Sequence, residues 1–142
     1  MKQLESMLLA FNKDTKAKRT RIFLVDDDPD IRFTFKIGLE EHGFVVDVFS
    51  DPTVALSKFK TGTYDLLLLD IKMPKMNGFE LYEKIKGLKT DQKPRVCFIT
   101  AFEVYYQALK ELFPKDDVDC FLSKPISLDE LVKTVKSELG LL

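Results

Sequence analysis

Short apolar runs alternate with amphipathic stretches from residue 22 to the end of the chain. The runs are almost wholly apolar, which is typical of strands that are buried on both faces of a sheet. The stretches between them carry apolar residues at helical spacing. This pattern predicts five strands, at residues 22–25, 44–49, 65–70, 96–100 and 120–123.

A helix is predicted after each strand. The first two begin at Asp-Pro pairs, where Asp caps the helix and Pro occupies its first turn. The last begins at a capping box, Ser127 to Glu130. The predicted helices span residues 28–43, 51–62, 78–88 and 102–113, and the fifth runs from residue 127 towards the end of the chain.

Alternating strands and helices indicate a parallel sheet, because each parallel pair needs a crossover connection. Right-handed crossovers then give an α/β fold with a doubly wound, five-stranded parallel sheet and helices on both faces. In such folds the functional crevice lies beyond the carboxyl ends of the strands. The residues that follow each strand are therefore the candidate site.

The first twenty residues do not share this rhythm. Residues 2–11 fit one short amphipathic helix, and residues 12–21 are polar and basic without periodicity, as in a tether. We therefore predict an N-terminal extension with a basic linker at 1–20 and a single domain at 21–142. A chain of 142 residues suits one domain.

Composition excludes several classes of protein. With 22 Lys+Arg against 23 Asp+Glu, the chain lacks the basic excess of a nucleic-acid-coating surface. Its 45% hydrophobic content is too high for a disordered chain. No apolar stretch approaches the ~20 residues of a membrane span, and the apolar run at residues 7–11 is too short for a secretory signal. We expect a cytoplasmic protein.

Cys97 and Cys120 both lie inside apolar runs. Without a Cys-x-x-Cys pair, and with a single histidine, they do not form a zinc site. We expect both to be buried, reduced packing residues.

The predicted strand ends carry acids, a hydroxyl and one lysine. Asp26 and Asp27 follow the first strand, Asp70 ends the third, Thr100 the fourth, and Lys124 follows the fifth. Two carboxylates ~4 Å apart repel by about 4 kcal/mol at an effective dielectric near 20, so the cluster needs a cation. An all-oxygen site suits Mg²⁺. With the Lys124 ammonium and the Thr100 hydroxyl it becomes a receptor for a dianionic phosphoryl group.

Asp70 is the candidate nucleophile. The chain offers no Ser-His or Cys-His pair, whereas an aspartate can form an acyl phosphate. Asp70 stands alone at the end of a central strand, and a short loop rich in turn residues follows at 71–78. Asp28, which precedes Pro29, is expected to cap a helix rather than to bind metal.

These motifs together resemble the receiver domains of two-component response regulators, over about residues 21–140. The matching segments are Leu24-Val25-Asp26-Asp27, Asp65 to Asp70 with Met73-Pro74 and Gly78, Thr100-Ala101, and Lys124-Pro125. The resemblance is to stand-alone, chemotaxis-type receivers. It implies a flavodoxin-like sheet with strand order 2-1-3-4-5.

The resemblance also implies a role for each acid. Asp70 accepts the phosphoryl group. Asp27 and Asp70 bind Mg²⁺ directly, Asp26 binds it mainly through water, and the backbone carbonyl of Lys72 completes the protein ligands.

Three further residues are implied to act after phosphorylation. Lys124 pairs with Asp70 and then with the phosphoryl oxygens, and its bond to Pro125 is cis. Thr100 contacts the phosphoryl group and draws the following loop inward. Phe121 occupies the position of the aromatic switch residue, without the hydroxyl of the common tyrosine.

The function so implied is phosphorylation-dependent signalling by protein contact. The implied phosphoryl donor is phosphohistidine of a histidine kinase or a phosphotransfer protein. The donor has to be another protein, because His42, the only histidine of this chain, is predicted far from the strand ends. The protein is not expected to be an enzyme beyond its own phosphorylation and dephosphorylation. Neither nucleic acid nor membrane is expected as a direct partner.

The expected readout surface consists of the helix at 102–113, the last strand and the last helix. The same surface is a candidate interface for a homodimer. Aromatic residues at 102, 106 and 113 widen the apolar surface of that helix. They predict either an exposed partner site or a helix buried all round, and the sequence does not decide between the two.

Three other functions are weighed against the receiver. A magnesium-dependent phosphatase normally has a second acid two residues after its nucleophile, where this chain has Lys72. A flavodoxin-like cofactor binder needs a phosphate-cradling loop after the first strand, where Asp26 to Asp28 would repel phosphate. A receiver-shaped adaptor that is never phosphorylated would not need the full set of site residues.

Overall fold

The computed structural model describes residues 3–5, 19–88, 93–101, 111 and 120–142, and contains a parallel five-stranded sheet. Its order is β2-β1-β3-β4-β5, so the predicted doubly wound fold and strand order are confirmed. The strands are β1 (Arg21–Val25), β2 (Val45–Phe49), β3 (Leu66–Asp70), β4 (Arg95–Thr100) and β5 (Cys120–Ser123).

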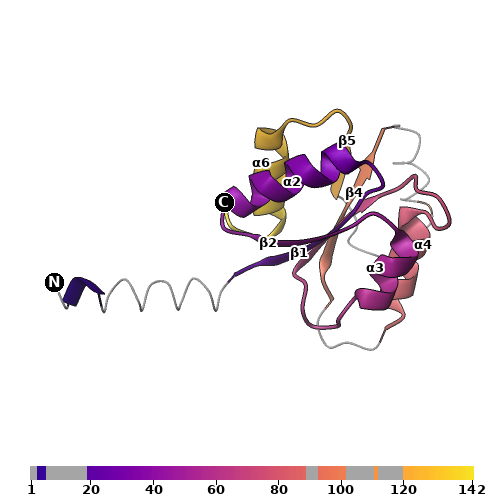
Figure 1. Ribbon diagram of the computed structural model, residues 1–142, viewed down its shortest axis with the longest axis horizontal. Helices are drawn as coiled ribbons and strands as arrows, with labels where there is room; N and C mark the ends of the chain where they lie inside the picture. Colours follow the sequence, from indigo (N-terminus) through magenta and orange to yellow (C-terminus); the bar gives the residue numbers. More distant parts are fainter. Residues whose placement is uncertain (1–2, 6–18, 89–92, 102–110, 112–119) are drawn as a thin grey trace.

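Helices cover both faces of the sheet. One face carries α2 (Pro29–Glu41) and α6 (Leu128–Glu138), and the other carries α3 (Pro52–Lys58) and α4 (Gly78–Lys86) (Figure 1). In the N-terminal stretch residues 3–5 are helical. The predicted helix at 102–113 lies outside the described residues except for position 111, and so do its aromatic positions and most of the predicted helix at 2–11.

The helix starts follow the cap predictions. The Asp28 side chain accepts a hydrogen bond from the Asp30 backbone at 2.9 Å, which makes Asp28 the N-cap of α2. Asp51 caps α3, and Ser127 caps α6. Helix α3 ends at Lys58, earlier than the predicted residue 62, because Phe59 leaves the helix in an extended conformation to pack against the ring of Phe23.

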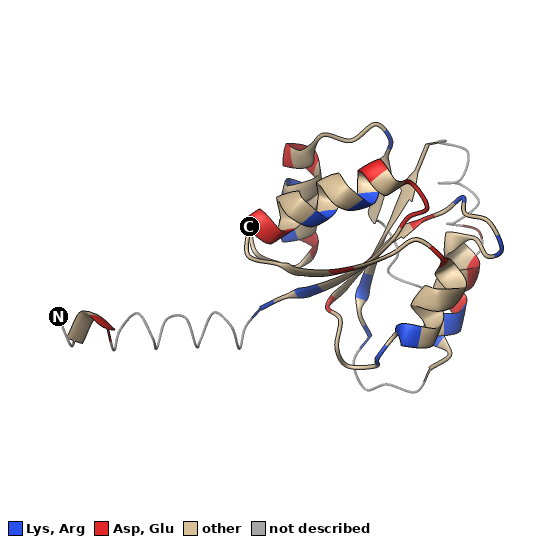
Figure 2. Ribbon diagram, viewed as in Figure 1, with Lys and Arg blue, Asp and Glu red and all other residues tan. Residues whose placement is uncertain are grey.

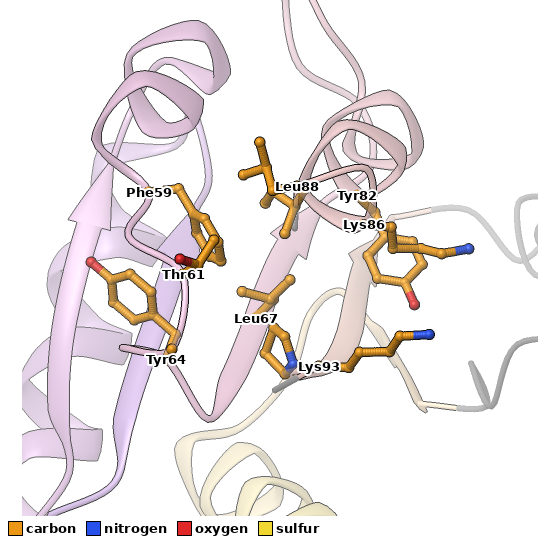
Figure 3. Close-up of a pocket in the computed structure, with 11 residues that line it drawn as sticks. Phe59, Thr61, Tyr64, Leu67, Tyr82, Lys86, Leu88 and Lys93 are labelled. Atoms are coloured by element: carbon orange, nitrogen blue, oxygen red, sulfur yellow. The ribbon is translucent and has the colours of Figure 1, made fainter. Parts of the chain in front are cut away.

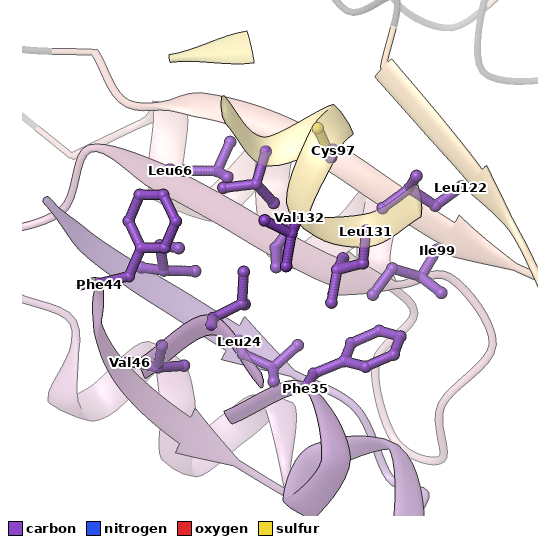
Figure 4. Packing of buried hydrophobic residues seen from close by; sticks show 14 of the residues in the cluster. Leu24, Phe35, Phe44, Val46, Leu66, Cys97, Ile99, Leu122, Leu131 and Val132 are labelled. Carbon is purple, nitrogen blue, oxygen red and sulfur yellow. The ribbon is translucent and has the colours of Figure 1, made fainter. Parts of the chain in front are cut away.

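The core has two halves, one on each side of the sheet. β1 and β3 are buried on both faces, so alternate residues of the same strand contribute to different halves. Figure 4 shows the half beneath α2 and α6, where Leu24 and Leu66 of the sheet meet Phe35 of α2 and Leu131 of α6. Buried central strands of this kind hold their carboxyl ends at fixed positions.

The expectation that Cys97 and Cys120 are reduced is wrong in this structure. The parallel register of β4 and β5 places the two residues opposite each other, with Cα atoms 4.6 Å apart, and they form a disulfide. Both are buried, as predicted. The sequence alone did not supply the register of these strands, and only the register brings the two sulfurs together.

Alkylation tests the disulfide directly. Iodoacetamide added to the denatured protein without reductant should label neither cysteine, and addition after reduction should label both, as measured by intact mass. Cys120→Ser is the control, because its remaining Cys97 should be labelled without reductant. Full labelling of the unreduced native chain would contradict the structure.

Candidate functional site

The first part of the candidate site is a pair of adjacent acids at the carboxyl end of the sheet. β1 and β3 are hydrogen-bonded neighbours with Val25 opposite Leu69, so Asp26 and Asp70 lie side by side. Asp26 is fully buried and Asp70 is 4% exposed. Asp27, on the turn that follows, is exposed.

Lys124 reaches both acids from the end of β5. Its ammonium lies 3.1 Å from Asp26 Oδ2 and 3.6 Å from Asp70 Oδ1. The backbone N–H of Lys124 donates to the Thr100 carbonyl at 2.7 Å, which fixes the lysine beside the end of β4. Segments separated by almost a hundred residues therefore converge on one rim, as predicted from the strand ends.

A cavity of about 210 Å³ opens over these groups. The predicted site residues Asp27, Asp70, Lys72, Thr100 and Lys124 line it, together with Asp28 and Ala101. Asp26 lies behind the lining in contact with Lys124. Phe121 stands apart on β5, half-buried, with its ring 6.3 Å from that of Phe98. The Lys124-Pro125 bond is cis, as the resemblance implied.

The electrostatics of the site are those of two carboxylates sharing one ammonium. Burial, together with the charge of Asp26, raises the pKa of Asp70 to about 7, although Lys124 opposes the shift. Burial also raises the pKa of Asp26. For Lys124, burial lowers the pKa but the charges of Asp26 and Asp70 raise it by more. The site thus retains an excess of negative charge that a cation can neutralise.

The donor set fits Mg²⁺. Carboxylate oxygens of Asp26, Asp27 and Asp70 lie within 4.8 Å of one another. Among the described residues, no hydrogen bond reaches the buried Asp26 Oδ2 in spite of its close ion pair with Lys124. One ammonium does not balance the charges of two buried carboxylates, and a hard cation with its water ligands would neutralise the remainder.

Three contacts that support the site were not anticipated from the sequence, although Gly78 itself is one of the residues that carry the resemblance. Arg32 of α2 donates to the Asp26 carbonyl at 2.7 Å. Lys75, with a positive φ of 72°, pairs with Asp51 at 2.8 Å and so ties the loop after β3 to α3. At Gly78, a Cβ would overlap the Asp70 carbonyl, so only glycine lets α4 start this close to β3.

A fourth support had a signal in the sequence that was overlooked. Asn77 and Glu80 form a reciprocal capping box at the start of α4. An Asn followed three residues later by Glu just before an apolar stretch is the pattern for this motif. The cap fixes the point at which the loop after Asp70 ends.

Comparisons with known proteins agree with the fold described above. The sequence-family model described as the response regulator receiver domain matches residues 22–136 of this chain. The chain belongs to this family. It is 30% identical over 121 residues to the response regulator ArlR of Staphylococcus saprophyticus, covering 84% of this chain and 52% of that protein.

Two solved receiver structures are similar to this receiver domain. TrrA from Thermotoga maritima, in complex with Mg(2+)-BeF, is 36% identical, with a TM-score of 0.71 and coverage of 84% and 99% of the two chains. The CheY-like receiver from Methanospirillum hungatei is 29% identical, with a TM-score of 0.73 and coverage of 87% and 95%.

Family membership makes this a signalling domain of two-component systems and implies phosphorylation-dependent signalling. It favours the receiver over the phosphatase and flavodoxin-like alternatives. The chain spans about half the length, or less, of most of the first curated relatives it matches. Within the described part of the receiver domain, no helix has the length and apolarity needed to cross a bilayer.

Proposed function

We propose that this receiver domain accepts a phosphoryl group on Asp70 from phosphohistidine of a histidine kinase or a phosphotransfer protein. The observation that carries the proposal is the position of the Asp70 carboxylate. It ends a fully buried strand, faces a cavity of about 210 Å³, and has the Lys124 ammonium 3.6 Å away. The complex of the similar protein TrrA with Mg(2+)-BeF supports the same assignment.

In the proposed transfer, an Asp70 carboxylate oxygen attacks phosphorus and the P–N bond to the donor imidazole breaks. The imidazole leaves with the bonding electron pair and takes up a proton. Lys124 neutralises charge on the phosphoryl oxygens, and Thr100 offers its hydroxyl to one of them. Water later attacks the acyl phosphate, releases inorganic phosphate and restores the carboxylate.

Mg²⁺ is the proposed cofactor. When bound, it neutralises charge on the carboxylates and on the transferring phosphoryl group. Asp26, Asp27, Asp70 and the Lys72 carbonyl are the groups that would hold it. Asp26 contributes a buried oxygen that accepts no hydrogen bond from the described residues, while Asp27 stands exposed at the mouth.

The proposed output is a shift between two conformations, read by a downstream protein. Thr100 and Lys124 are joined by a backbone hydrogen bond of 2.7 Å, so a phosphoryl group that contacts both side chains pulls on the ends of β4 and β5 together. Phe121, the proposed switch, lies on β5 opposite Phe98 and three residues before Lys124. The differential contacts must supply about 5.5 kcal/mol for a nearly complete switch.

Intact mass tests the phosphoryl acceptor. With acetyl phosphate and Mg²⁺, the native chain should gain the mass of one HPO₃ group, and Asp70→Asn should gain none. Asp65→Asn is a matched control at the opposite end of the same strand, where Asp65 accepts a hydrogen bond from the Arg21 backbone. It should label like the native chain, and EDTA should suppress labelling in both. An adduct that persists in Asp70→Asn would overturn the assignment.

A further inference from the structure

A second cavity lies at the other end of the sheet from Asp70. It has a volume of about 110 Å³ and opens between the loop after α3, the first residues of β3 and the end of α4. Its apolar wall includes Leu67 and Ile85, both buried in the core. The rings of Phe59 and Tyr64 stack 5.5 Å apart on the opposite side (Figure 3).

Positive charge gathers at one end of this cavity. Figure 3 shows the Lys86 and Lys93 ammonium groups pointing to the same side, with the Tyr82 hydroxyl between them. The Lys86 ammonium lies 5.3 Å from the centroid of the Tyr82 ring. None of the described residues that line the cavity is acidic, although the chain as a whole carries a net charge of −1.

The polar groups at the opposite end are directed away from the cavity. The Tyr64 hydroxyl donates to Asp47 at 2.8 Å, and Asp47 also pairs with Arg21 at 3.0 Å. Tyr64 therefore presents only its ring to the cavity. The space is thus apolar over most of its depth and cationic at one side of its mouth.

We propose that this cavity binds a small amphipathic organic anion, with an apolar body of about one ring and a single carboxylate held by Lys86 and Lys93. At about 110 Å³ the space is smaller than the cavity of about 150 Å³ that binds benzene, so the apolar body can be no larger than one ring and the carboxylate remains at the mouth. There it meets two ammonium groups, whose charge-assisted hydrogen bonds are stronger than neutral ones. A neutral or cationic analogue lacks that contact.

This site is independent of the phosphoryl site. Its lining residues come from the loop after α3, the start of β3, the end of α4 and the residues just before β4, whereas Asp70 and Thr100 stand at the opposite ends of β3 and β4. The proposed ligand therefore has its own recognition chemistry and does not compete with Mg²⁺ or a phosphoryl group.

Titration of the full native chain with 4-fluorobenzoate, followed by ¹⁹F and ¹H–¹⁵N NMR, tests the proposal. We expect saturable binding with a Kd of about millimolar, as for a ligand of this size. The perturbed amides should include Leu67, Ile85 and Leu88, and those near Asp70 should not move. The neutral analogue 4-fluorobenzyl alcohol should bind about tenfold more weakly.

Lysine variants separate the site from general attraction to a basic surface. Lys86→Gln and Lys93→Gln should each weaken 4-fluorobenzoate about fivefold to tenfold. Lys84→Gln is the matched control, since Lys84 is exposed on the same helix but does not line the cavity. Absence of saturation, equal binding by all three variants and the native chain, or perturbations centred on Asp70 would each overturn the proposal.

Discussion

Asp26→Asn should make the metal-free protein more stable by about 2 kcal/mol at pH 8, because it removes a fully buried carboxylate. The native site holds Asp26 and Asp70 against one ammonium. Neutralising Asp26 leaves Lys124 paired one-to-one with Asp70. The substituted amide keeps the oxygen that accepts the Asp28 backbone N–H at 2.9 Å, so the turn is retained. Its NH₂ group then replaces Oδ2, so the Lys124 ammonium has to move from there towards Asp70.

The free energy of unfolding should depend on pH in a direction that a mere change in packing would not produce. Burial and the charge of Asp26 raise the pKa of Asp70 to about 7, above its ordinary value of 3.8. A carboxyl whose folded pKa is raised stabilises the fold below its unfolded pKa and loses that contribution as pH rises through the folded value. For Asp70 the loss amounts to about 4 kcal/mol between pH 4 and 8. In Asp26→Asn, which lacks the second-largest cause, the loss should be smaller.

Urea unfolding in EDTA at pH 6 and pH 8 measures both effects. Asp47→Asn is the control of opposite sign. Burial tends to raise the pKa of Asp47, but its bonds to Arg21 and Tyr64 lower it overall, so its charge stabilises the fold above pH 4. That variant should be less stable than the native chain at both pH values. If Asp26→Asn were also less stable than the native chain at pH 8 without metal, the repulsion between the Asp26 and Asp70 carboxylates would not destabilise the metal-free fold.

The fold was predictable because its strands carry an unambiguous signal. In a strand such as Leu66–Asp70, buried on both faces, every residue before the terminal Asp70 is apolar. Parallel strands also have to end on the same edge, so Asp26, Asp70 and Lys124 were expected at one edge, and the strand order that brings them together there was implied by the resemblance. The caps at Asp28 and Asp51 could also be predicted, because an Asp before Pro accepts a hydrogen bond from a backbone N–H in the first turn of the same helix.

What could not be predicted depends on register and on contacts between distant segments. The Cys97–Cys120 disulfide requires the β4–β5 alignment, which no local pattern encodes. Arg32 looks like an ordinary helix residue until its guanidinium is seen to donate to the Asp26 carbonyl. Likewise Gly78 shows its purpose only where α4 approaches the backbone of Asp70. The roles of Asp70, Lys124, Thr100, Phe121 and the magnesium ligands remain predictions.

Lys124→Gln should have the opposite effect to Asp26→Asn, and a larger one. In the native chain the Lys124 ammonium lies 3.1 Å from Asp26 Oδ2 and 3.6 Å from Asp70 Oδ1. Removing it leaves the two carboxylates buried together without their counter-charge. We expect the free energy of unfolding in EDTA at pH 8 to fall by about 3 kcal/mol, the low end for breaking a buried pair, because the lysine side chain is 20% exposed. The loss should shrink at pH 6, where the carboxyls take up protons.

Magnesium should narrow the difference in stability between Lys124→Gln and the native chain, since the ammonium and the metal neutralise the same two carboxylates. We expect Lys124→Gln to bind Mg²⁺ about tenfold more tightly than the native chain, and to regain more stability from it, at about 1.4 kcal/mol for each factor of ten. Lys75→Gln is the control, because its ion pair with Asp51 is exposed and its loss should leave the free energy of unfolding almost unchanged. In Asp26→Asn/Lys124→Gln most of the lost stability should return. If Mg²⁺ bound Lys124→Gln more weakly than the native chain, the lysine would have to position the metal site rather than compete with it.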